Sequence, residues 1–457
     1  MSASNPTASR GYLPNQMVPL MKLIPLSLQV VIVSFAATTL VPLLVGVPVS
    51  NALLSSGVAT ICATVMSYLL FGKMIPLFYG SSFSFIAVMV AITKVTYGQV
   101  ATPDALATLE AGVVTVGVIE ILIGYVVRRA GLDALNKVLP PAIIGPVVMV
   151  IGLALAFAAM NMLFGGCCGS QGDPKWVAVG IFTLIITALT SVYLQGKGFA
   201  GQISLLIGAL LGYVFALLLG LTNLQAVAAA PLFAMPTFVL PNFTLPGSLG
   251  AVIAISVMTV AVIPEMIGHL SQISLYIDHE AESQGLPAEG IDKLQGGNLQ
   301  LAGLGDIICG MLTGVPGTSY AEGAAAAVFS RAYSGYVYIG AGVIVLLMGF
   351  SGTLAALINS IPTAVIGGIA IPMFGAIALQ GVAYSQKMQV DYFSRKNLIL
   401  GGIILMSGVS GIGFPNGLLP LTIPVLFPTG LPAIATGIVV AILLNLAFEY
   451  WKPSAAE

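Results

Sequence analysis

Long apolar stretches, separated by Pro, Gly or charged residues, recur along the whole sequence of 457 residues. A helix that crosses a bilayer needs about 20 such residues. Lipid offers no partners to backbone N–H and C=O groups, so stretches of this kind cross as helices. The stretches run over 24–46, 52–72, 78–95, 107–127, 140–160, 175–195, 199–221, 249–277, 297–314, 317–330, 335–357, 361–383, 397–414 and 430–450. The sequence therefore predicts an all-α polytopic membrane protein with 14 transmembrane segments.

Composition supports this class and excludes others. Hydrophobic residues make up 58% of the chain and charged residues 7%, whereas soluble domains carry about 25% charged residues. Fifteen Lys and Arg against 16 Asp and Glu leave no basic excess, so we expect no nucleic-acid partner. The 4 cysteines form no CxxC pair, and we expect free thiols at Cys167 and Cys168 and no metal or cofactor. The start of the chain, Met1 to Gln16, has no signal-peptide pattern, so the first spanning helix is expected to direct insertion.

The distribution of Lys and Arg predicts the topology. Cytoplasmic connections are enriched in these residues. With a cytoplasmic N-terminus, 13 of the 15 fall inside, and only Lys94 and Lys175 fall outside. We therefore expect a multi-pass protein of the cell (inner or plasma) membrane, with residues 1–23 and the C-terminus in the cytoplasm.

Two pairs of similar motifs indicate an internal repeat. Gly80-Ser81-Ser82-Phe83 resembles Gly317-Thr318-Ser319-Tyr320, and the Pro-rich start of segment 5 at 139–145 resembles that of segment 12 at 361–367. Both matches relate segment n to segment n+7, and an odd number of crossings inverts the second copy. Segments 3 and 10 are short and follow Gly- and Ser-rich turns, so we expect half-helices preceded by short strands. Inverted repeats with paired broken helices are typical of secondary transporters that bind substrate at the midplane.

Glu265 and His269 are the first candidate site residues. An ionisable group at the bilayer centre costs about 2.5–3.5 kcal/mol on insertion scales, so each ionisable residue inside a predicted segment requires a structural or functional explanation. Glu265 follows Pro264 in segment 8, and His269 lies four residues later on the same helical face. The two groups can share a proton or bind the donor and acceptor edges of a polar ring. The alternative is a structural pairing of Glu265 and a His269 at the cytoplasmic interface.

Glu322 is the second intramembrane carboxylate. It follows the turn that opens segment 10, where a helix N-terminus offers free N–H groups and a positive dipole. It is either a helix cap or a ligand group, and the depth of the turn favours the ligand role. Phe83 and Tyr320 occupy equivalent positions in the repeat and could sandwich a flat ligand, although such aromatics usually only pack.

Asp306 and Glu120 are weaker candidates. Asp306 could pair with another helix or assist proton movement. Glu120 lies in the middle of segment 4 and could bridge helices or face a seam between domains.

Along nearly its whole length, the chain resembles the nucleobase–ascorbate transporter family, also called the uracil/xanthine permeases. The resemblance rests on five stretches. They are Ile24-Pro25-Leu26-Ser27-Leu28-Gln29, Gly80-Ser81-Ser82-Phe83-Ser84-Phe85-Ile86, Glu265 to His269, Thr318-Ser319-Tyr320-Ala321-Glu322 and Gly408-Val409-Ser410-Gly411.

This resemblance implies a 7+7 inverted repeat. A core domain would comprise residues 24–130 and 249–357, and a gate domain would comprise residues 131–221 and 361–450. It further implies a proton-coupled symporter that imports a nucleobase by elevator-type motion, forms a homodimer and is not an enzyme. The residues that match the family's substrate site are Glu265, Glu322, Phe83, Tyr320 and His269, completed by Ala37 and Ala321, with Glu265 and His269 as the coupling groups.

The chain departs from the family pattern at several positions. Val30 replaces the usual His of helix 1, Ala321 stands where uracil members have Gly, and Gly323 stands where the signature has Asn. Sodium-coupled or uncoupled transport of another small polar or anionic solute therefore stays open as the alternative. A channel would show polar stripes in several helices, and an intramembrane enzyme would need a catalytic motif that the sequence lacks.

Overall fold

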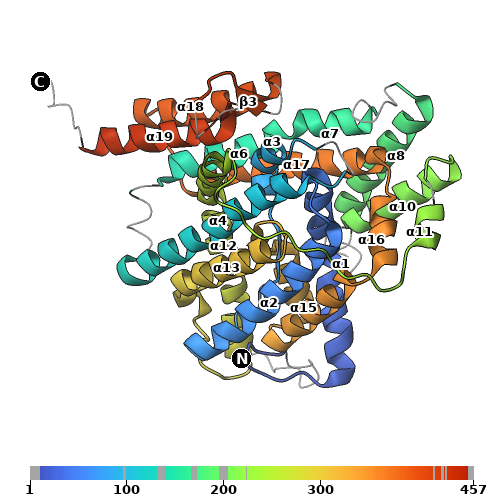
Figure 1. Ribbon diagram of the computed structural model, residues 1–457. Coiled ribbons are helices and arrows are strands. Elements are labelled where there is room, and N and C mark those ends of the chain that lie inside the picture. The colour runs from blue at the N-terminus through green and yellow to red at the C-terminus, as the bar shows by residue number, and fades with distance from the viewer. Residues whose placement is uncertain are drawn as a thin grey trace, which may run out of the picture.

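A computed structural model shows a helical protein in which each of the fourteen predicted stretches contains a helix (Figure 1). The structure describes residues 11–95, 99–131, 137, 139–165, 172–194, 204–222, 224–414, 417–423, 427 and 430–450, except for the side chains of residues 204, 321, 322, 325, 329 and 450. Cys167 and Cys168 lie outside the described residues, as do residues 1–10 of the predicted N-terminal segment.

The first half of the chain contains α1 Leu20–Val45, α2 Val49–Phe71, β1 Tyr79–Ser81, η1 Phe83–Phe85, α3 Ile86–Thr93, α4 Pro103–Ala130, α6 Pro141–Ala154, α7 Ala156–Leu163, α8 Pro174–Tyr193, α10 Ser204–Leu218 and α11 Gln225–Ala229. The second half contains α12 Ser248–Ser283, η3 Ile291–Leu294, α13 Gln295–Met311, β2 Gly317–Ser319, α14 Ala321–Ser330, α15 Gly335–Gly349, α16 Gly352–Asn359, α17 Thr363–Lys387, α18 Arg395–Ser410, η4 Gly411–Gly413, β3 Leu418–Leu419, β4 Leu431–Pro432 and α19 Ala433–Tyr450.

The helices confirm an all-α membrane protein. Within the described residues, 8 helices are long and apolar enough to cross a bilayer, and the pair α15 and α16, bent by 81°, makes a ninth. Several predicted segments are instead filled by shorter helices, including α10, α14 and α19. Some predicted segments are divided between a helix and irregular backbone, so one helix does not fill the whole of each predicted crossing.

The two predicted half-helices are preceded by strands, as the Gly- and Ser-rich turns indicated. β1 and β2 pair antiparallel, with Tyr79 opposite Ser319 and Ser81 opposite Gly317. The segments come from opposite halves of the sequence, so their pairing brings the two similar Gly- and Ser-rich motifs together. A proline also starts the helix of each Pro-rich motif, since Pro140 caps α6 and Pro362 caps α17. An N-terminal proline is tolerated there because its missing N–H has no intrahelical partner.

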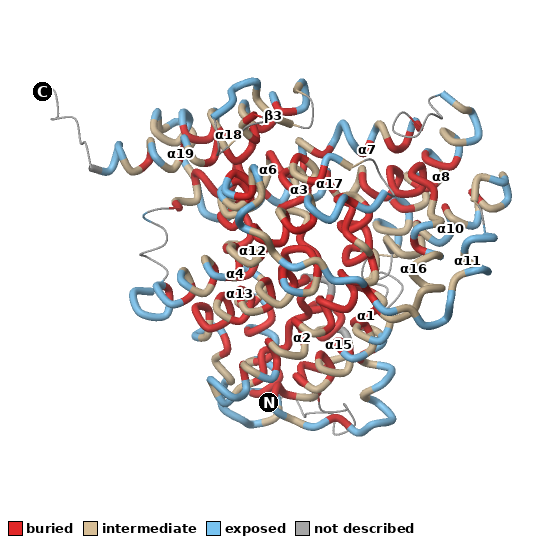
Figure 2. The backbone as a smooth tube through the Cα atoms, in the orientation of Figure 1, coloured by how far each residue is buried: buried red, intermediate tan, exposed pale blue. Residues whose placement is uncertain are grey.

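The helices divide into two groups by their packing. In the first group α2 packs on α15 and α13, α4 packs on α12 and α13, and α1 packs on α14 and α15. In the second group α17 packs on α6, α7 and α8, α18 packs on α6 and α19, and α10 packs on α8. Figure 2 shows most buried backbone gathered in the centre of the molecule, around α1, α12 and α17. The strand pair belongs to the first group.

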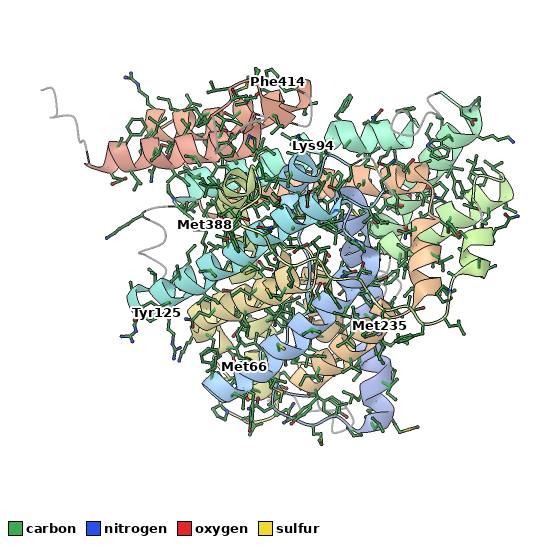
Figure 3. The ribbon with its side chains drawn as sticks, viewed as in Figure 1. Met66, Lys94, Tyr125, Met235, Met388 and Phe414 are labelled. Carbon is green, nitrogen blue, oxygen red and sulfur yellow. The ribbon has the colours of Figure 1, made fainter. Side chains whose placement is uncertain are left out.

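The outer surface is apolar, as expected of a protein surrounded by lipid. Tyr125 projects from the outer side of α4 (Figure 3) and is 50% exposed. Leu211 of α10 and Leu443 of α19 are also exposed. Large exposed apolar patches mark contacts with a membrane or with another protein.

Candidate functional site

The strand pair positions the start of both half-helices. Ser82 N–H donates to Pro316 O at 2.9 Å, and Tyr320 N–H donates to Phe78 O at 3.0 Å, which extends the ladder at both ends. Because the strands are antiparallel, η1 leaves the pair at one end and α14 leaves it at the other. Each helix start carries free backbone N–H groups and a partial positive charge. Two such starts flank one point inside the protein.

Tyr320 connects β1, β2 and α1. Its hydroxyl donates to Ser81 O at 2.9 Å and accepts from Thr38 Oγ1 at 3.4 Å. Its ring lies over Gly80, where an added Cβ would approach Cζ to 2.4 Å. Tyr320 is 4% exposed. Its ring is therefore enclosed by the strands and α1, and its predicted role beside a flat ligand stays a prediction.

One face of α12 borders open space next to β2. Glu265 and His269 are both half-buried, and Gly268 between them is exposed. A Cβ on Gly268 would meet no atom within 4 Å. His269 Nδ1 lies 3.2 Å from Ser319 Oγ, in hydrogen-bonding distance of the end of β2. The structure thus places the carboxylate and the imidazole on one open face, where they can bind a polar molecule.

Ala37 and Phe83 come from α1 and η1. Ala37 is buried in α1, directly before Thr38. Phe83 is half-buried and contacts Phe374 of α17 edge to face, with ring centroids 6.2 Å apart. Phe83 therefore lies where the two packing groups meet, so a ligand on Phe83 would also lie next to the second packing group.

Ala321 and Glu322 form the first turn of α14, and their side chains lie outside the described residues. The predicted convergence of the Glu322 and Glu265 carboxylates consequently stays a prediction. The backbone of the same turn is fixed by the first group, because Tyr338 OH donates to Gly323 O at 3.0 Å. This backbone lies close to α1, since a Cβ on Gly323 would come within 3.9 Å of Ser34 Oγ.

Glu120 and Asp306 are buried on α4 and α13, two helices that pack closely together. Asp306 Oδ1 accepts from Gly317 N–H at 2.6 Å, which ties it to β2. Among the described residues, no three His, Cys, Asp or Glu side chains are arranged to hold a metal ion.

A cavity of about 690 Å³ lies between the packing groups, lined by α3, α7 and η4. Its walls are mostly apolar, and Glu265, His269 and Tyr320 do not line it. We therefore place the candidate site at the α12 face, where the polar groups are.

Sequence reasoning did not single out three residues that the structure adds. Ser319 contacts His269, Thr38 contacts Tyr320, and Phe374 contacts Phe83. Ser319 was part of the repeated turn, which could have indicated it. No local signal distinguishes Thr38 or Phe374, because their roles depend on which helices become neighbours.

Comparison with known sequences gives consistent matches along the chain. Residues 21–416 match the profile Xan_ur_permease, described as a permease family. The chain is 33% identical over 440 residues to a uracil permease of Paenibacillus larvae, covering 95% of this chain and 96% of that one. It is 35% identical over 401 residues to a uracil permease of Bacillus subtilis, covering 84% and 85%. It is 30% identical over 420 residues to the putative pyrimidine permease RutG of Escherichia coli, covering 91% and 89%.

Solved structures share the fold at low sequence identity. The transmembrane domain of the cyanobacterial bicarbonate transporter BicA matches with a TM-score of 0.54 at 14% identity, covering 96% of this chain and 99% of that one. The anion transporter Slc26a9 from mouse matches with a TM-score of 0.62 at 11% identity, covering 95% and 69%. At such identities the likeness extends to the fold alone.

Proposed function

This chain belongs to the xanthine and uracil permease family, and on that premise we propose that it imports a nucleobase, uracil or a related base, by proton symport. It is a membrane transporter and not an enzyme. The observation that carries the proposal is the open α12 face, where Glu265 and His269 lie beside the paired strands of two half-helices.

We further propose that the fourteen helical segments form a 7+7 inverted repeat. The first packing group would be the core domain, residues 24–130 and 249–357, and the second the gate domain, residues 131–221 and 361–450. The pairing of β1 with β2 supports this division, because it joins the third and tenth segments in one group. The core would move against a dimeric gate in an elevator-type cycle, with both chain ends in the cytoplasm of the cell.

The substrate chemistry fits a base that presents N–H donors next to C=O acceptors. Glu265 can accept an N–H, and the free backbone N–H groups that begin α14 can donate to a carbonyl. In this proposal Glu322, Ala321 and Ala37 complete the pocket, and Phe83 and Tyr320 border it. Glu265 and His269 also provide the coupling groups, because a half-buried carboxylate that meets substrate and proton together leaves no unpaired charge.

Ligand-induced thermal stabilisation of the purified protein tests the substrate. A ligand at 100 times its Kd that binds only the folded state stabilises it by about 2.7 kcal/mol. We expect stabilisation by uracil or a related base among uracil, xanthine, uric acid, adenine and bicarbonate. Each compound is measured at two pH values, with and without sodium. Stabilisation by bicarbonate alone, or only with sodium, would contradict the proposal and favour the alternative solute or ion.

Glu265→Gln tests the site. A hydrogen bond to a charged group contributes about 1.5–3 kcal/mol, so the loss of the carboxylate should weaken base binding about 10- to 150-fold. Glu282→Gln is the matched control, because Glu282 is an exposed carboxylate on the same helix. Unchanged affinity and unchanged pH dependence in Glu265→Gln would refute its role.

A further inference from the structure

Two carboxyl groups are buried at the seam of α4 and α13, and no described Lys, Arg or His forms an ion pair with either. Glu120 is 0% exposed and Asp306 is 2% exposed. Within the described residues, both oxygens of Glu120 and Oδ2 of Asp306 have no hydrogen-bond partner. The ion pairs recorded there join other residues, namely Lys73–Glu289, Arg331–Glu280 and Lys396–Glu449. The cations of the described part of the chain therefore do not neutralise the pair.

Glycines bring the two helices into backbone contact at this seam. A Cβ on Gly117 would lie 2.3 Å from Gly303 O, and a Cβ on Gly124 would lie 2.6 Å from Gly296 O. This pairing makes the helices antiparallel, so Glu120 and Asp306, each three residues after a glycine of the Gly117–Gly303 pair, lie on opposite sides of that contact along the seam. Their negative charges nevertheless repel each other across it.

A buried amide whose nitrogen has no hydrogen-bond partner among the described residues accompanies the pair. Tyr79 OH, on β1, donates to Asn298 Oδ1 at 2.9 Å. The same hydroxyl lies within reach of the charges of both Glu120 and Asp306. Asn298 is 0% exposed, and its Nδ2 has no partner among the described residues. This arrangement leaves one unused donor and three unused acceptor oxygens in a space closed to bulk solvent.

We propose that Glu120 and Asp306 form a proton-binding site, separate from the α12 face, and that its occupancy is linked to the position of β2. An unpaired ionised carboxylate in an apolar interior costs several kcal/mol or more, so the group becomes neutral instead. Two carboxylates whose charges repel across a closed seam cannot both ionise cheaply, and a proton on either one removes most of the repulsion. The O–H that is formed can serve one of the unused acceptors.

The link to β2 runs through one hydrogen bond. Asp306 Oδ1 accepts from the N–H of Gly317, the first residue of β2, at 2.6 Å. β2 leads directly into α14, which carries Glu322. Release of the proton places a second negative charge in the closed seam, which is costly until β2 shifts and water enters. If the protein is the transporter proposed above, this site couples a proton to movement of the substrate half-helix.

Other titratable groups lie on the neighbouring elements. They are Glu110 on α4, Cys309 on α13, Cys62 on α2, Tyr79 on β1, and Glu265 and His269 on α12. Glu110 is also 0% exposed and without a partner among the described residues. It lies ten residues before Glu120 on the same helix, and its side-chain oxygens form no hydrogen bond to β2 or to any other described residue, so it is the matched control.

Infrared spectroscopy of the purified protein at neutral pH tests the proton directly. A protonated carboxylic acid has a carbonyl stretch that carboxylates lack. We expect part of this band to disappear in Glu120→Gln and in Asp306→Asn, which retains an acceptor for Gly317 N–H. An unchanged band in both variants would overturn the proposal, and this result does not depend on the identity of the substrate.

Transport of radiolabelled uracil in proteoliposomes tests the coupling. With one proton per substrate, a gradient of one pH unit supports about tenfold accumulation. We expect Glu120→Gln and Asp306→Asn to lose this accumulation, to about onefold, while uracil counterflow stays within about twofold of wild type. Glu110→Gln should retain both activities.

Three results would overturn the coupling role. They are full accumulation in both variants, loss of counterflow together with accumulation, and wild-type accumulation driven by sodium alone. Absence of counterflow and of base binding in the wild type would instead refute the proposed function, and the infrared result would then still decide whether the seam holds a proton.

Discussion

Gly80 is the residue at which the strand pair tolerates no side chain. A methyl group there would lie 2.4–2.6 Å from two ring carbons and the hydroxyl oxygen of Tyr320, and that ring is held by the hydrogen bond from its hydroxyl to Ser81 O. Overpacking of this kind lowers the free energy of unfolding by about 1–3 kcal/mol. We expect Gly80→Ala to lower the melting temperature of the purified protein, and Tyr320→Leu to recover part of the loss in the double variant.

The matched control is Gly268→Ala, because a Cβ at Gly268 meets no atom within 4 Å. It should melt at or above the wild-type temperature, since Ala stabilises a helix by about 1 kcal/mol relative to Gly. Equal melting of Gly80→Ala and wild type would show that Tyr320 can move away from β1.

Individual residues were predictable where a local rule applied to them. The cost of burying charge identified Glu265, Asp306 and Glu120 from the sequence, and the structure places all three at polar or closed positions inside the molecule. The partners of these residues were not predictable. Ser319 meets His269, and Gly317 meets Asp306, only because β2 folds back between α12 and α13.

At the scale of elements, the seam of α4 and α13 depends on small residues. A Cβ on Gly303 would lie 2.3 Å from Gly117 O, and the backbone cannot yield as a side chain can. Small residues let transmembrane helices approach closely. We expect Gly303→Ala to lower the melting temperature, with a cost of at least about 1–3 kcal/mol.

Gly402→Ala in α18 is the control for the seam, because a Cβ at Gly402 meets no atom within 4 Å. The two substitutions add the same methyl group to a glycine inside a helix. If both variants melt alike, backbone contact between α4 and α13 does not limit stability.

The sequence predicted where helices occur better than how they are divided. Apolar length located all fourteen stretches, and Gly- and Ser-rich turns located both strands. The break between α6 and α7 at Leu155 and the 81° bend between α15 and α16 were not predicted. Hydropathy does not detect such breaks, because an apolar segment has the same composition whether its helix is continuous or bent.

At the scale of the whole molecule, the two packing groups meet through apolar contacts. Leu40 of α1 forms a buried cluster with Met162 of α7 and Ile366 of α17. Phe83 and Phe374 make a second contact between the groups. Apolar contacts are non-directional, so they can be exchanged for others as one group slides along the other. The motif repeats predicted the two halves of the chain, but this boundary depends on tertiary packing that no motif encodes.

Covalent linkage across this boundary tests whether the groups move. In a protein whose native cysteines (Cys62, Cys167, Cys168, Cys309) are replaced, Leu40→Cys and Ile366→Cys are joined by a short bifunctional thiol reagent. The control links α1 to α15 inside one group, through Ser27→Cys and Gly340→Cys. There a Cβ on Gly340 would lie 3.1 Å from Ser27 Cβ, slightly closer than a disulfide requires.

We expect the Leu40–Ile366 link to reduce uracil uptake in proportion to its yield while thermal stabilisation by uracil persists, because substrate still binds in one conformation. The Ser27–Gly340 link should leave uptake near the uncrosslinked level. Full uptake at complete Leu40–Ile366 linkage would show that transport proceeds without movement between the two groups, and the elevator-type cycle would then be wrong.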